Sequence, residues 1–374
     1  MPSVDLVRSS PISKTFRAAK VQGMFDIPAA DTSDTRITAE LPLDEKPWQI
    51  GVITGASGSG KSTISRELWP DQTVVADQFD WAGASLVDDF PENMTPQEIT
   101  GLLASVGFGS APAWLRPWRA LSTGQQFRAS LARALAEGRG GITVFDEYTS
   151  TVDRTVAKAV ATATGKHVRR SPESQFVAVS CHKDFIPWLQ PDWVLDLDGG
   201  DFTWGPVQPR PQVKVTVHDA ARHMWPLFRG HHYLSGNLNK SSRAFVAFVE
   251  LDGDEPRPAG FFAVLPAMGH KGWRRGHRTV VLPDFQGLGI GNRMVEAVVE
   301  QLWEREKLRF RSVTSAPGLV HHRRRHPEMW RLASGPKMNP PSGRTSRDNP
   351  VTSAGRLSTS WVYIPRSLRT PNVR

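Results

Sequence analysis

The sequence has a single cysteine, Cys181, among its 374 residues. One thiol cannot form an intrachain disulfide, which excludes the disulfide-rich secreted scaffolds and is typical of a protein of the reducing cytoplasm. No run of eighteen apolar residues occurs, and Met1–Asp5 lacks the charged-then-apolar pattern of a signal peptide. We therefore expect a cytoplasmic protein that crosses no membrane. The length suits two or three domains, each large enough to bury a core.

Acidic residues are scarce in the second half of the chain. Residues 1–200 hold 19 Lys and Arg against 24 Asp and Glu, a net charge of −5, whereas residues 201–374 hold 27 against 13, or +14. Residues 301–374 alone carry 15 basic and 4 acidic side chains. A surplus of positive charge concentrated in one part of the chain indicates a polyanionic partner. Nucleic acid is the first candidate because its phosphates dominate such binding. A basic tail that only aids solubility is the alternative.

A glycine-rich stretch follows the apolar run Trp48–Thr54 and precedes a helix-compatible segment, Thr63–Trp69. Glycines let the backbone fold around an anion, so that several N–H groups and a helix N-terminus point at phosphate oxygens. A lysine and a hydroxyl at its end can reach the phosphates and a Mg²⁺ ion. We predict a P-loop that binds ATP through Gly55, Ala56, Ser57, Gly58, Ser59, Gly60, Lys61, Ser62 and Thr63.

Further motifs follow this P-loop in a fixed order. Leu121-Ser122-Thr123-Gly124-Gln125 precedes a segment with helical periodicity that Gly138 can end, which predicts a second anion-binding helix N-terminus. The apolar run 141–147 predicts a strand that ends in the carboxylates Asp146 and Glu147. The segment 150–153 comes next, and a further strand, 177–181, leads to His182.

In this order the motifs resemble those of an ABC-type ATPase, over roughly residues 10–205. Walker A corresponds to 55–62, the signature to 121–125 with Thr123 in place of the usual glycine, Walker B to 142–147 and the D-loop to 150–153. The resemblance implies that Ser62 and Asp146 hold Mg²⁺, that Glu147 polarises the attacking water and that His182 bonds the γ-phosphate. Gln78 is the candidate for a further Mg²⁺ contact, although it lies only 17 positions after Lys61.

The same resemblance implies a homodimer in which two ATP molecules are sandwiched head to tail. Ser122, Gly124, Gln125 and Asp153 would then contact the ATP bound to the other subunit. A transporter subunit is the least favoured assignment, because nothing spans a membrane and only 61 positions separate Lys61 from Ser122. Family members that act as clamps or switches on nucleic acid fit the basic second half better.

A Pro-rich linker leads into a second pattern of elements. We predict a strand (213–218), a helix (219–228), a hairpin with arms 243–251 and 260–265, and a strand over 278–282. The run Gln286-Gly287-Leu288-Gly289-Ile290-Gly291 then opens an amphipathic helix at Asn292 and again makes an anion cradle. Residues 335–356 are predicted to form a loop and 357–365 a closing strand, whereas residues 14–21 and 35–41, near the start of the chain, are predicted to form short strands.

This half resembles the GNAT acetyltransferases over roughly residues 212–374. The resemblance implies that backbone amides of 286–291, with Asn292, bind the pyrophosphate of an acyl-CoA and that the Leu282 backbone pairs with its pantetheine. Such enzymes often use a late tyrosine to protonate the thiolate, and no tyrosine follows strand 309–315 where it is expected. The candidates for proton transfer are instead His232, Tyr233, Glu250, His321 and His322.

The predicted fold class is therefore an α/β P-loop ABC-type ATPase domain (1–205), a linker (206–212) and a GNAT-like α+β acyltransferase domain (213–374). The predicted function is ATP hydrolysis coupled to N-acyl transfer from acetyl-CoA or another acyl-CoA to an amine of DNA or RNA, with Arg323, Arg324 and Arg325 on the nucleic acid. One alternative is a nucleic-acid-binding ATPase switch whose GNAT half does not react. Another is acetylation of protein lysines or of a small amine.

Overall fold

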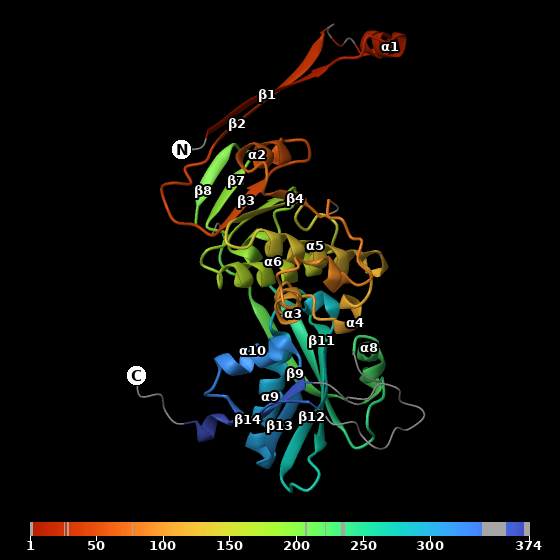
Figure 1. Cartoon of the computed structure of the whole chain (residues 1–374), viewed down its shortest axis with the longest axis vertical. Helices are drawn as coiled ribbons and strands as arrows, with labels where there is room; N and C mark the ends of the chain where they lie inside the picture. Colours follow the sequence, from red (N-terminus) through yellow and green to blue (C-terminus); the bar gives the residue numbers. More distant parts are fainter. Residues whose placement is uncertain are drawn as a thin grey trace.

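The computed structural model describes residues 3–25, 27, 30–76, 78–205, 208–220, 222–232, 236–338 and 357–369. Within these residues the strands form an arm of two strands, a sheet of six and a sheet of seven. The arm lies at one end of an elongated molecule and the seven-stranded sheet at the other (Figure 1). No helix in the described ranges is long and apolar enough to span a bilayer.

The six-stranded sheet is parallel except for its last strand. Its strands, in spatial order, are β4 (Thr73–Val75), β5 (Ile142–Asp146), β6 (Gln175–Ser180), β3 (Ile50–Thr54), β7 (Trp193–Asp196) and the antiparallel β8 (Asp201–Trp204). Every residue of β3 is buried, because helices cover both faces of the sheet. Neighbouring residues of β3 accordingly belong to different cores: Ile53 packs with Ile64 of α2 (Lys61–Leu68), and Val52 packs with α5 (Thr123–Glu137) and α6 (Arg154–Val168).

The predicted boundaries of this region are largely confirmed. Ser122 is the N-cap of α5 and Gly138 its C-cap, as the sequence pattern indicates. Between β4 and α5 lie η1 (Leu86–Asp89), α3 (Pro96–Ser105), α4 (Ala111–Trp114) and η2 (Trp118–Ala120). A short helix, α7 (Ile186–Leu189), joins β6 to β7.

The N-terminal arm corrects one prediction. Strands β1 (Ser3–Pro11) and β2 (Thr32–Glu40) pair antiparallel, and β2 confirms the strand predicted over 35–41. The strand predicted over 14–21 is wrong, because α1 (Phe16–Met24) lies there. The Thr15 hydroxyl caps this helix by accepting from the Ala18 amide at 3.3 Å, a local bond that the partial alternation of apolar residues does not reveal. The helix lies at the outer end of the arm (Figure 1).

The seven-stranded sheet forms the second half. Its spatial order is β14 (Trp330–Met338), β15 (Leu357–Tyr363), β13 (Arg309–Thr314), β12 (Trp273–Val281), β11 (Arg257–Pro266), β10 (Arg243–Leu251) and β9 (Val213–Ala220). The 310 segments are η3 (Arg222–Met224), η4 (Pro283–Phe285) and η5 (Arg366–Leu368), and the helices are α8 (Trp225–Arg229), α9 (Ile290–Glu306) and α10 (Pro317–Arg325).

Several predicted elements of this half have different bounds. The hairpin and the closing strand are confirmed by β10, β11 and β15. The helix predicted from 219 starts later, because Asp219 and Ala220 continue β9 in register with β10. The loop predicted from 335 is strand up to Met338, where β14 pairs with β15, and residues 339–356 lie outside the described part.

Helices α5 and α6 lie between the two large sheets (Figure 1). One hydrophobic core accordingly includes side chains of both halves, from Phe145 of β5 to Phe262 of β11 and Phe285 of η4. The face of α6 that meets the second half presents small and polar residues at helical spacing. These are Thr155, Lys158, Ala159, Thr162, Ala163 and Lys166.

Candidate functional site

Four predicted ATP-site segments lie at the carboxyl ends of adjacent parallel strands. The P-loop follows β3, His182 follows β6, the two carboxylates end β5 and Gln78 follows β4. The strand register places Thr54 opposite Ser180 and Val75 opposite Asp146. In an open parallel sheet this edge is where ligands bind, so the topology assembles one site from segments more than a hundred residues apart.

The P-loop surrounds its own lysine. Lys61 is 7% exposed, and its Nζ donates to the carbonyl oxygens of Gly55 at 2.9 Å and Ala56 at 2.7 Å. Gly60 caps α2 in the left-handed conformation, with φ 96°, and a Cβ there would lie 2.5 Å from Ile37. Only glycine fits this position without strain, and the turn leaves the first amides of α2 for an anion.

The Walker B carboxylates have different surroundings. Asp146 is 3% exposed, and one of its oxygens accepts from the Glu147 amide at 3.0 Å. Glu147 is exposed and has a positive φ of 57°, while Ser150 Oγ donates to its Oε2 at 2.6 Å. A buried carboxylate is an oxygen donor that suits Mg²⁺, which takes one or two carboxylates plus substrate phosphates, and Ser62 remains the predicted second protein ligand.

His182 and Gln78 occupy the flanks of this edge. His182 is half-buried, and its amide donates to Ser180 Oγ at 3.2 Å. Gln78 is exposed, and its Oε1 accepts from the Val75 amide at 3.2 Å. The structure therefore brings Gln78 to the strand next to Asp146 despite its short spacing from Lys61. Their roles toward nucleotide remain predictions.

The signature segment and the D-loop form exposed helix N-termini. Ser122 and Gln125 make a capping box at the start of α5, in which the Gln125 side chain accepts from the Ser122 amide at 3.1 Å. Gly124 lies in the first turn, and a Cβ added there would have no neighbouring atom within 4 Å. Asp153 caps α6 by accepting from the amides of Thr155 and Val156. Within the described residues no hydrogen bond or ion pair joins 122–125 to the P-loop.

The glycine-rich loop of the second half connects β12 to α9. Gly287 and Gly289 have positive φ values of 97° and 82°, and Gly289 is the N-cap of α9. Among the described hydrogen bonds, the amides of 287–289 donate none, whereas the Gln286 amide donates to Pro283 O at 3.2 Å. The anion cradle therefore consists of the amides from Gly287 onward, one residue shorter than predicted, and it fits the pyrophosphate of an acyl-CoA.

The prediction for Leu282 is corrected. Its amide donates to Ala259 O at 2.9 Å, so it is not left to donate to pantetheine, and its carbonyl already accepts from the Phe285 amide at 3.0 Å. The available edge lies earlier in β12. Within the described residues, β12 pairs with β13 only over Trp273–Arg275, and the rest of that edge, 276–281, has no strand beside it.

The proton-transfer candidates are scattered. His322 bonds Glu296 at 2.7 Å, and Glu296 also accepts from the indole of Trp330 at 3.0 Å. Burial opposes the effect, yet these bonds hold the pKa of Glu296 below its ordinary value. Burial and neighbouring arginines lower the pKa of His321. Glu250 is paired with Lys214 at 2.9 Å, His232 stacks edge-on against Trp225, and Tyr233 lies outside the described residues.

The other tyrosines do not supply the missing acid. Tyr148 is fully buried beside the six-stranded sheet. Tyr363 is 5% exposed and donates to Glu300 at 2.7 Å. Burial and this carboxylate raise the pKa of Tyr363. The buried Tyr363 hydroxyl is engaged with Glu300, so it acts as a structural donor in this arrangement.

The structure identifies residues that sequence reasoning missed. Asp198 accepts from the P-loop amide of Ala56 at 2.6 Å, and this bond lowers the pKa of Asp198. His277 is the extra residue of a β-bulge in β12, a feature that often re-aims side chains beside active sites. Burial and nearby cations lower its pKa to about 4, so the ring is neutral at pH 7 and accepts from the Asn239 amide. Neither has a sequence signal, because both depend on tertiary contacts.

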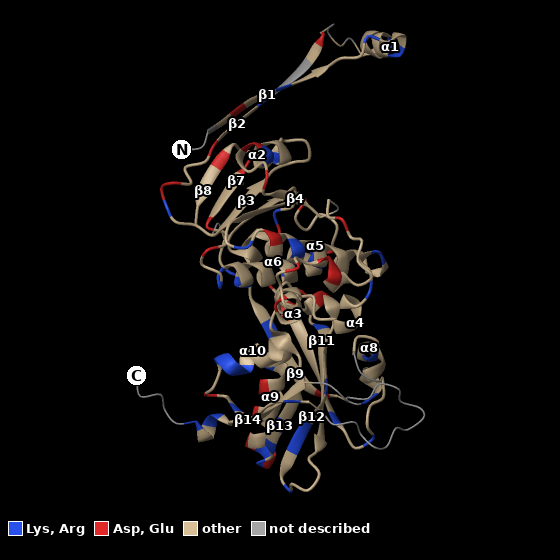
Figure 2. Ribbon diagram, in the orientation of Figure 1, with Lys and Arg blue, Asp and Glu red and all other residues tan. Residues whose placement is uncertain are grey.

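The predicted basic patch is only partly exposed. Arg324 and Arg325 are exposed on α10 (Figure 2). Arg323 is 2% exposed and lies over the Trp330 ring, with its guanidinium carbon 4.3 Å from the ring centre. Burial lowers its pKa to about 10. Arg323 therefore cannot contact a phosphate backbone, which corrects that part of the prediction.

Comparisons with known proteins address the two halves separately. The model of the GNAT acetyltransferase family matches residues 214–318. Among solved structures, the dimeric MJ0796, a bacterial ABC transporter cassette, is 15% identical, with 53% of this chain and 98% of that chain covered and a TM-score of 0.36. The cbiO1 protein of an ABC transporter complex from Clostridium perfringens is 16% identical, with 48% and 82% covered and a TM-score of 0.34.

The ribosomal-protein-S18-alanine N-acetyltransferase from Escherichia coli is 15% identical, with 43% of this chain and 99% of that chain covered and a TM-score of 0.29. A comparison with curated proteins finds no match. The assignment of the first half follows from its own motif order and from the strand edge that assembles them. The chain thus joins an ABC ATPase-like α/β region to a GNAT acetyltransferase domain at residues 214–318.

Proposed function

We propose that the chain is an ATP-binding and ATP-hydrolysing enzyme coupled to acyl-CoA-dependent N-acyl transfer. The observation that carries this proposal is the assembly of the P-loop, Asp146, Glu147 and His182 at one strand edge. The glycine loop of the GNAT domain packs against α6 of the ATPase-like half. We keep the boundaries 1–205, 206–212 and 213–374 as part of the proposal.

In the ATPase half, each residue has one role. Lys61 leaves its two carbonyl partners to neutralise the β- and γ-phosphates. Ser62 and Asp146 would hold Mg²⁺, with Gln78 as a further candidate contact. Glu147 accepts a hydrogen bond from the attacking water, and His182 donates one to the γ-phosphate. The exposed N-termini of α5 and α6 contribute Ser122, Gly124, Gln125 and Asp153 to the ATP of a second copy, in a homodimer.

In the acyltransferase half, the loop from Gly287 to Asn292 binds the CoA pyrophosphate, and the open edge of β12 over 276–281 pairs with the pantetheine. Bound acyl-CoA supplies a thioester carbonyl, which an amine attacks while the thiolate leaves. The amine must lose a proton as the new bond forms, and the thiolate must gain one. ATP is not needed for this chemistry, so its hydrolysis controls access or conformation.

The proposed acceptor is an amine of DNA or RNA. The support is the net charge of +14 over residues 201–374, together with the exposed Arg324 and Arg325 on α10. Both arginine side chains are exposed, so a polyanion can reach them, and Figure 2 shows basic residues on α10.

The test is label transfer. Purified protein, Mg-ATP and acetyl-labelled CoA are incubated with DNA, with total RNA, with a lysine-rich protein or with no acceptor, and label is counted in each polymer. Label in nucleic acid that appears only with ATP supports the proposal and identifies the polymer. Label in protein alone, or transfer that ignores ATP, contradicts the acceptor or the coupling, respectively.

A second candidate function is a nucleic-acid-binding ATPase whose GNAT domain binds CoA without reacting. The position of Tyr363, which faces a carboxylate, and the dispersed histidines favour it, because the described residues offer no evident acid for the thiolate. ATP hydrolysis that rises with nucleic acid while no label transfers would favour this alternative over the enzyme.

A further inference from the structure

A small cavity lies at the junction of the two halves, beside the glycine loop. It has a volume of about 210 Å³ and receives side chains from α6, from the linker and from α9, together with Leu288 of the loop. Ligand sites that hold a whole drug-sized molecule measure about 300–1,000 Å³. The junction cavity is therefore the size of a subsite for one group of a larger ligand.

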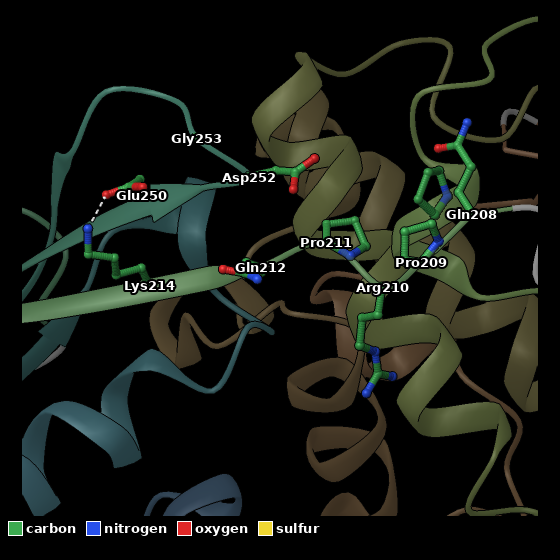
Figure 3. Close-up of a pocket in the computed structure, with 10 residues that line it drawn as sticks. Gln208, Pro209, Arg210, Pro211, Gln212, Lys214, Glu250, Asp252 and Gly253 are labelled. Carbon is green, nitrogen blue, oxygen red and sulfur yellow. Dashed lines mark hydrogen bonds and ion pairs between the residues drawn. The ribbon is translucent and has the colours of Figure 1, made fainter.

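Three cations line this cavity, and no acidic side chain does. Lys166 comes from the last turn of α6, Arg210 from the linker and Arg293 from the first turn of α9. Figure 3 shows the Arg210 side chain pointing away from the Lys214–Glu250 ion pair of the neighbouring surface. Like charges from three separate segments repel one another, and this arrangement costs free energy unless an anion lies between them.

These three cations differ from a lysine on the same face of α6 that the protein itself pairs. Lys158, two turns earlier on the same face of α6, forms an ion pair with Asp254 at 3.1 Å. Within the described residues, by contrast, no ion pair or side-chain hydrogen bond is formed by Lys166, Arg210 or Arg293. Burial and the positive charges of Arg293, Arg210 and Arg170 lower the pKa of Lys166 to about 8. The chain therefore holds a half-buried lysine among arginines with no counter-charge of its own.

The adjoining loop is positioned by the ATPase-like region. The Gly109 amide donates to Gln286 Oε1 at 2.9 Å, and a Cβ on Gly287 would lie 2.8 Å from that of Ala163 on α6. The amides from Gly287 onward and the three cations are thus on neighbouring surfaces of one junction, joined by Leu288. Both are suited to phosphate oxygens, the amides through the helix N-terminus and the cations through charge.

We propose that the junction cavity binds a phosphate group of acyl-CoA through Lys166, Arg210 and Arg293, so that the ATPase-like region and the linker complete the CoA site of the GNAT domain. This inference rests on the proposed acyl-CoA function. In this arrangement one ligand contacts residues from the ATPase-like region, the linker and the GNAT domain, so CoA bridges the two halves.

The test is calorimetric titration of the full chain with acetyl-CoA, with its 3′-dephospho form and with inorganic pyrophosphate. The variants are Lys166→Gln, Arg210→Gln and the double variant. Lys166→Gln is expected to fold, because it removes a charge that has no partner, and Lys166→Arg keeps the charge. Lys158→Gln is the matched control, since it changes the same helix face but removes a lysine that the protein itself pairs.

The expected result is a loss of acetyl-CoA affinity of about tenfold for each single variant and more for the double variant. Lys166→Arg and Lys158→Gln should bind like the wild type. If the 3′-dephospho form binds weakly and is insensitive to Lys166→Gln, the 3′-phosphate occupies the cavity. If binding of the 3′-dephospho form and of pyrophosphate is still weakened by Lys166→Gln, the diphosphate of CoA occupies the cavity. Either pattern supports the proposal.

Two results would overturn the inference, and they are distinguishable. Wild-type affinity for acetyl-CoA in the double variant would place the phosphates elsewhere while leaving the acyl-CoA function intact. An equal loss in Lys158→Gln would show that the junction as a whole, and not the three cations, sets the affinity. No binding of acetyl-CoA to the wild type would remove the proposed function itself and this inference with it.

Discussion

Glu147 has a backbone conformation that few non-glycine residues adopt. Its φ is 57°, and Thr149, two residues later, has φ 63°. Such conformations cost about 1–3 kcal/mol each and persist where the surroundings hold them. Here the Asp146 carboxylate accepts from the Glu147 amide, and the Ser150 hydroxyl donates to the Glu147 side chain. The Glu147 carboxylate is therefore held at the end of β5, on the sheet edge that also carries the P-loop.

Glu147→Gln should separate ATP binding from hydrolysis. The amide oxygen can still accept from Ser150, so the loop keeps its shape, but it polarises water poorly. We expect phosphate release to fall about 100- to 1,000-fold, with fluorescent-nucleotide affinity unchanged. Glu92→Gln, on an exposed turn, is the control. Hydrolysis at the wild-type rate in Glu147→Gln would mean that another group positions the water.

The pH dependence of acetyl-CoA affinity follows from Lys166. Its pKa of about 8 lies between neutral and alkaline pH, and only the protonated amine attracts phosphate. Affinity should therefore be full near pH 7 and fall up to about tenfold by pH 9, as the lysine loses its proton. Lys166→Arg should flatten the profile, because arginine does not titrate there. Acetyl-CoA has no free thiol that would titrate in this range. If the affinity of Lys166→Arg falls with pH as that of the wild type does, Lys166 is not the cause of the pH dependence.

At the scale of elements, Gly287 couples the loop to α6. Its φ of 97° disfavours any side chain, and an added Cβ would lie 2.8 Å from Ala163 Cβ and 3.3 Å from the Ala159 carbonyl oxygen. We expect Gly287→Ala to lower the free energy of unfolding by roughly 1–3 kcal/mol. Urea denaturation measures this change.

Gly318→Ala is the matched control for that substitution. Gly318 lies in the first turn of α10 with nothing within 4 Å of an added Cβ, so the change in unfolding free energy should stay within about 0.5 kcal/mol. Equal effects of the two substitutions would show that the contact between the loop and α6 does not stabilise the fold.

Elements with a strong local signal could be predicted from the sequence. The capping residues of α5 and the glycine turn before α9 are local, and both are found where the pattern indicates. Helix α1 was missed because nothing in it is buried, so it has no apolar face for periodicity to reveal. The burial of Arg323 depends on partners that the fold brings to it. The hydrogen bonds of the Leu282 backbone depend on Ala259, distant in sequence, and on a local turn. Residue type alone does not encode either feature.

That the predicted ATP-site residues lie at one edge of the sheet could be predicted for a related reason. Each lies just after an apolar strand, and parallel strands end at one edge, so residue order implies proximity. The junction cavity has no such signal. Lys166 is one of two lysines on α6, and only the folded structure shows that it lines the same cavity as Arg210 and Arg293.

For the whole molecule, the exposed N-terminus of α5 predicts assembly. If Gly124 faces the ATP of a second copy, Mg-ATP should convert Glu147→Gln from monomer to dimer in analytical ultracentrifugation. Adding Gly124→Asp should prevent this, because the new carboxylate repels phosphate. The fold should survive, since acidic residues are favourable in the first turn of a helix. Gly318→Asp, the same change in the first turn of α10, should still dimerise. Dimerisation of the Gly124→Asp protein would contradict the shared site.

Two helices connect the proposed dimer surface to the glycine loop. Helix α6 starts at the Asp153 cap and carries Lys166 at its other end, about 20 Å away at 1.5 Å per residue. Helix α5 starts at Ser122 and carries Arg128, which is 2% exposed and donates to Pro283 O at 2.9 Å. Burial lowers the pKa of Arg128 to about 10, yet the guanidinium stays charged at pH 7. Movement of either helix on ATP binding must therefore be transmitted to the loop or break these contacts.

ATP should accordingly change the affinity for acetyl-CoA, and linkage requires acetyl-CoA to change ATP affinity by the same factor. Coupling of this kind amounts to about 1–3 kcal/mol, or 5- to 150-fold. Calorimetry on Glu147→Gln, which holds ATP intact, measures all four sides of the cycle. Adding Arg128→Gln removes the contact between α5 and Pro283. The coupling factor should then move toward one, because only the connection through α6 remains. A factor of one in the parent protein would mean that the two sites are independent, and ATP could not then gate acyl transfer through CoA binding.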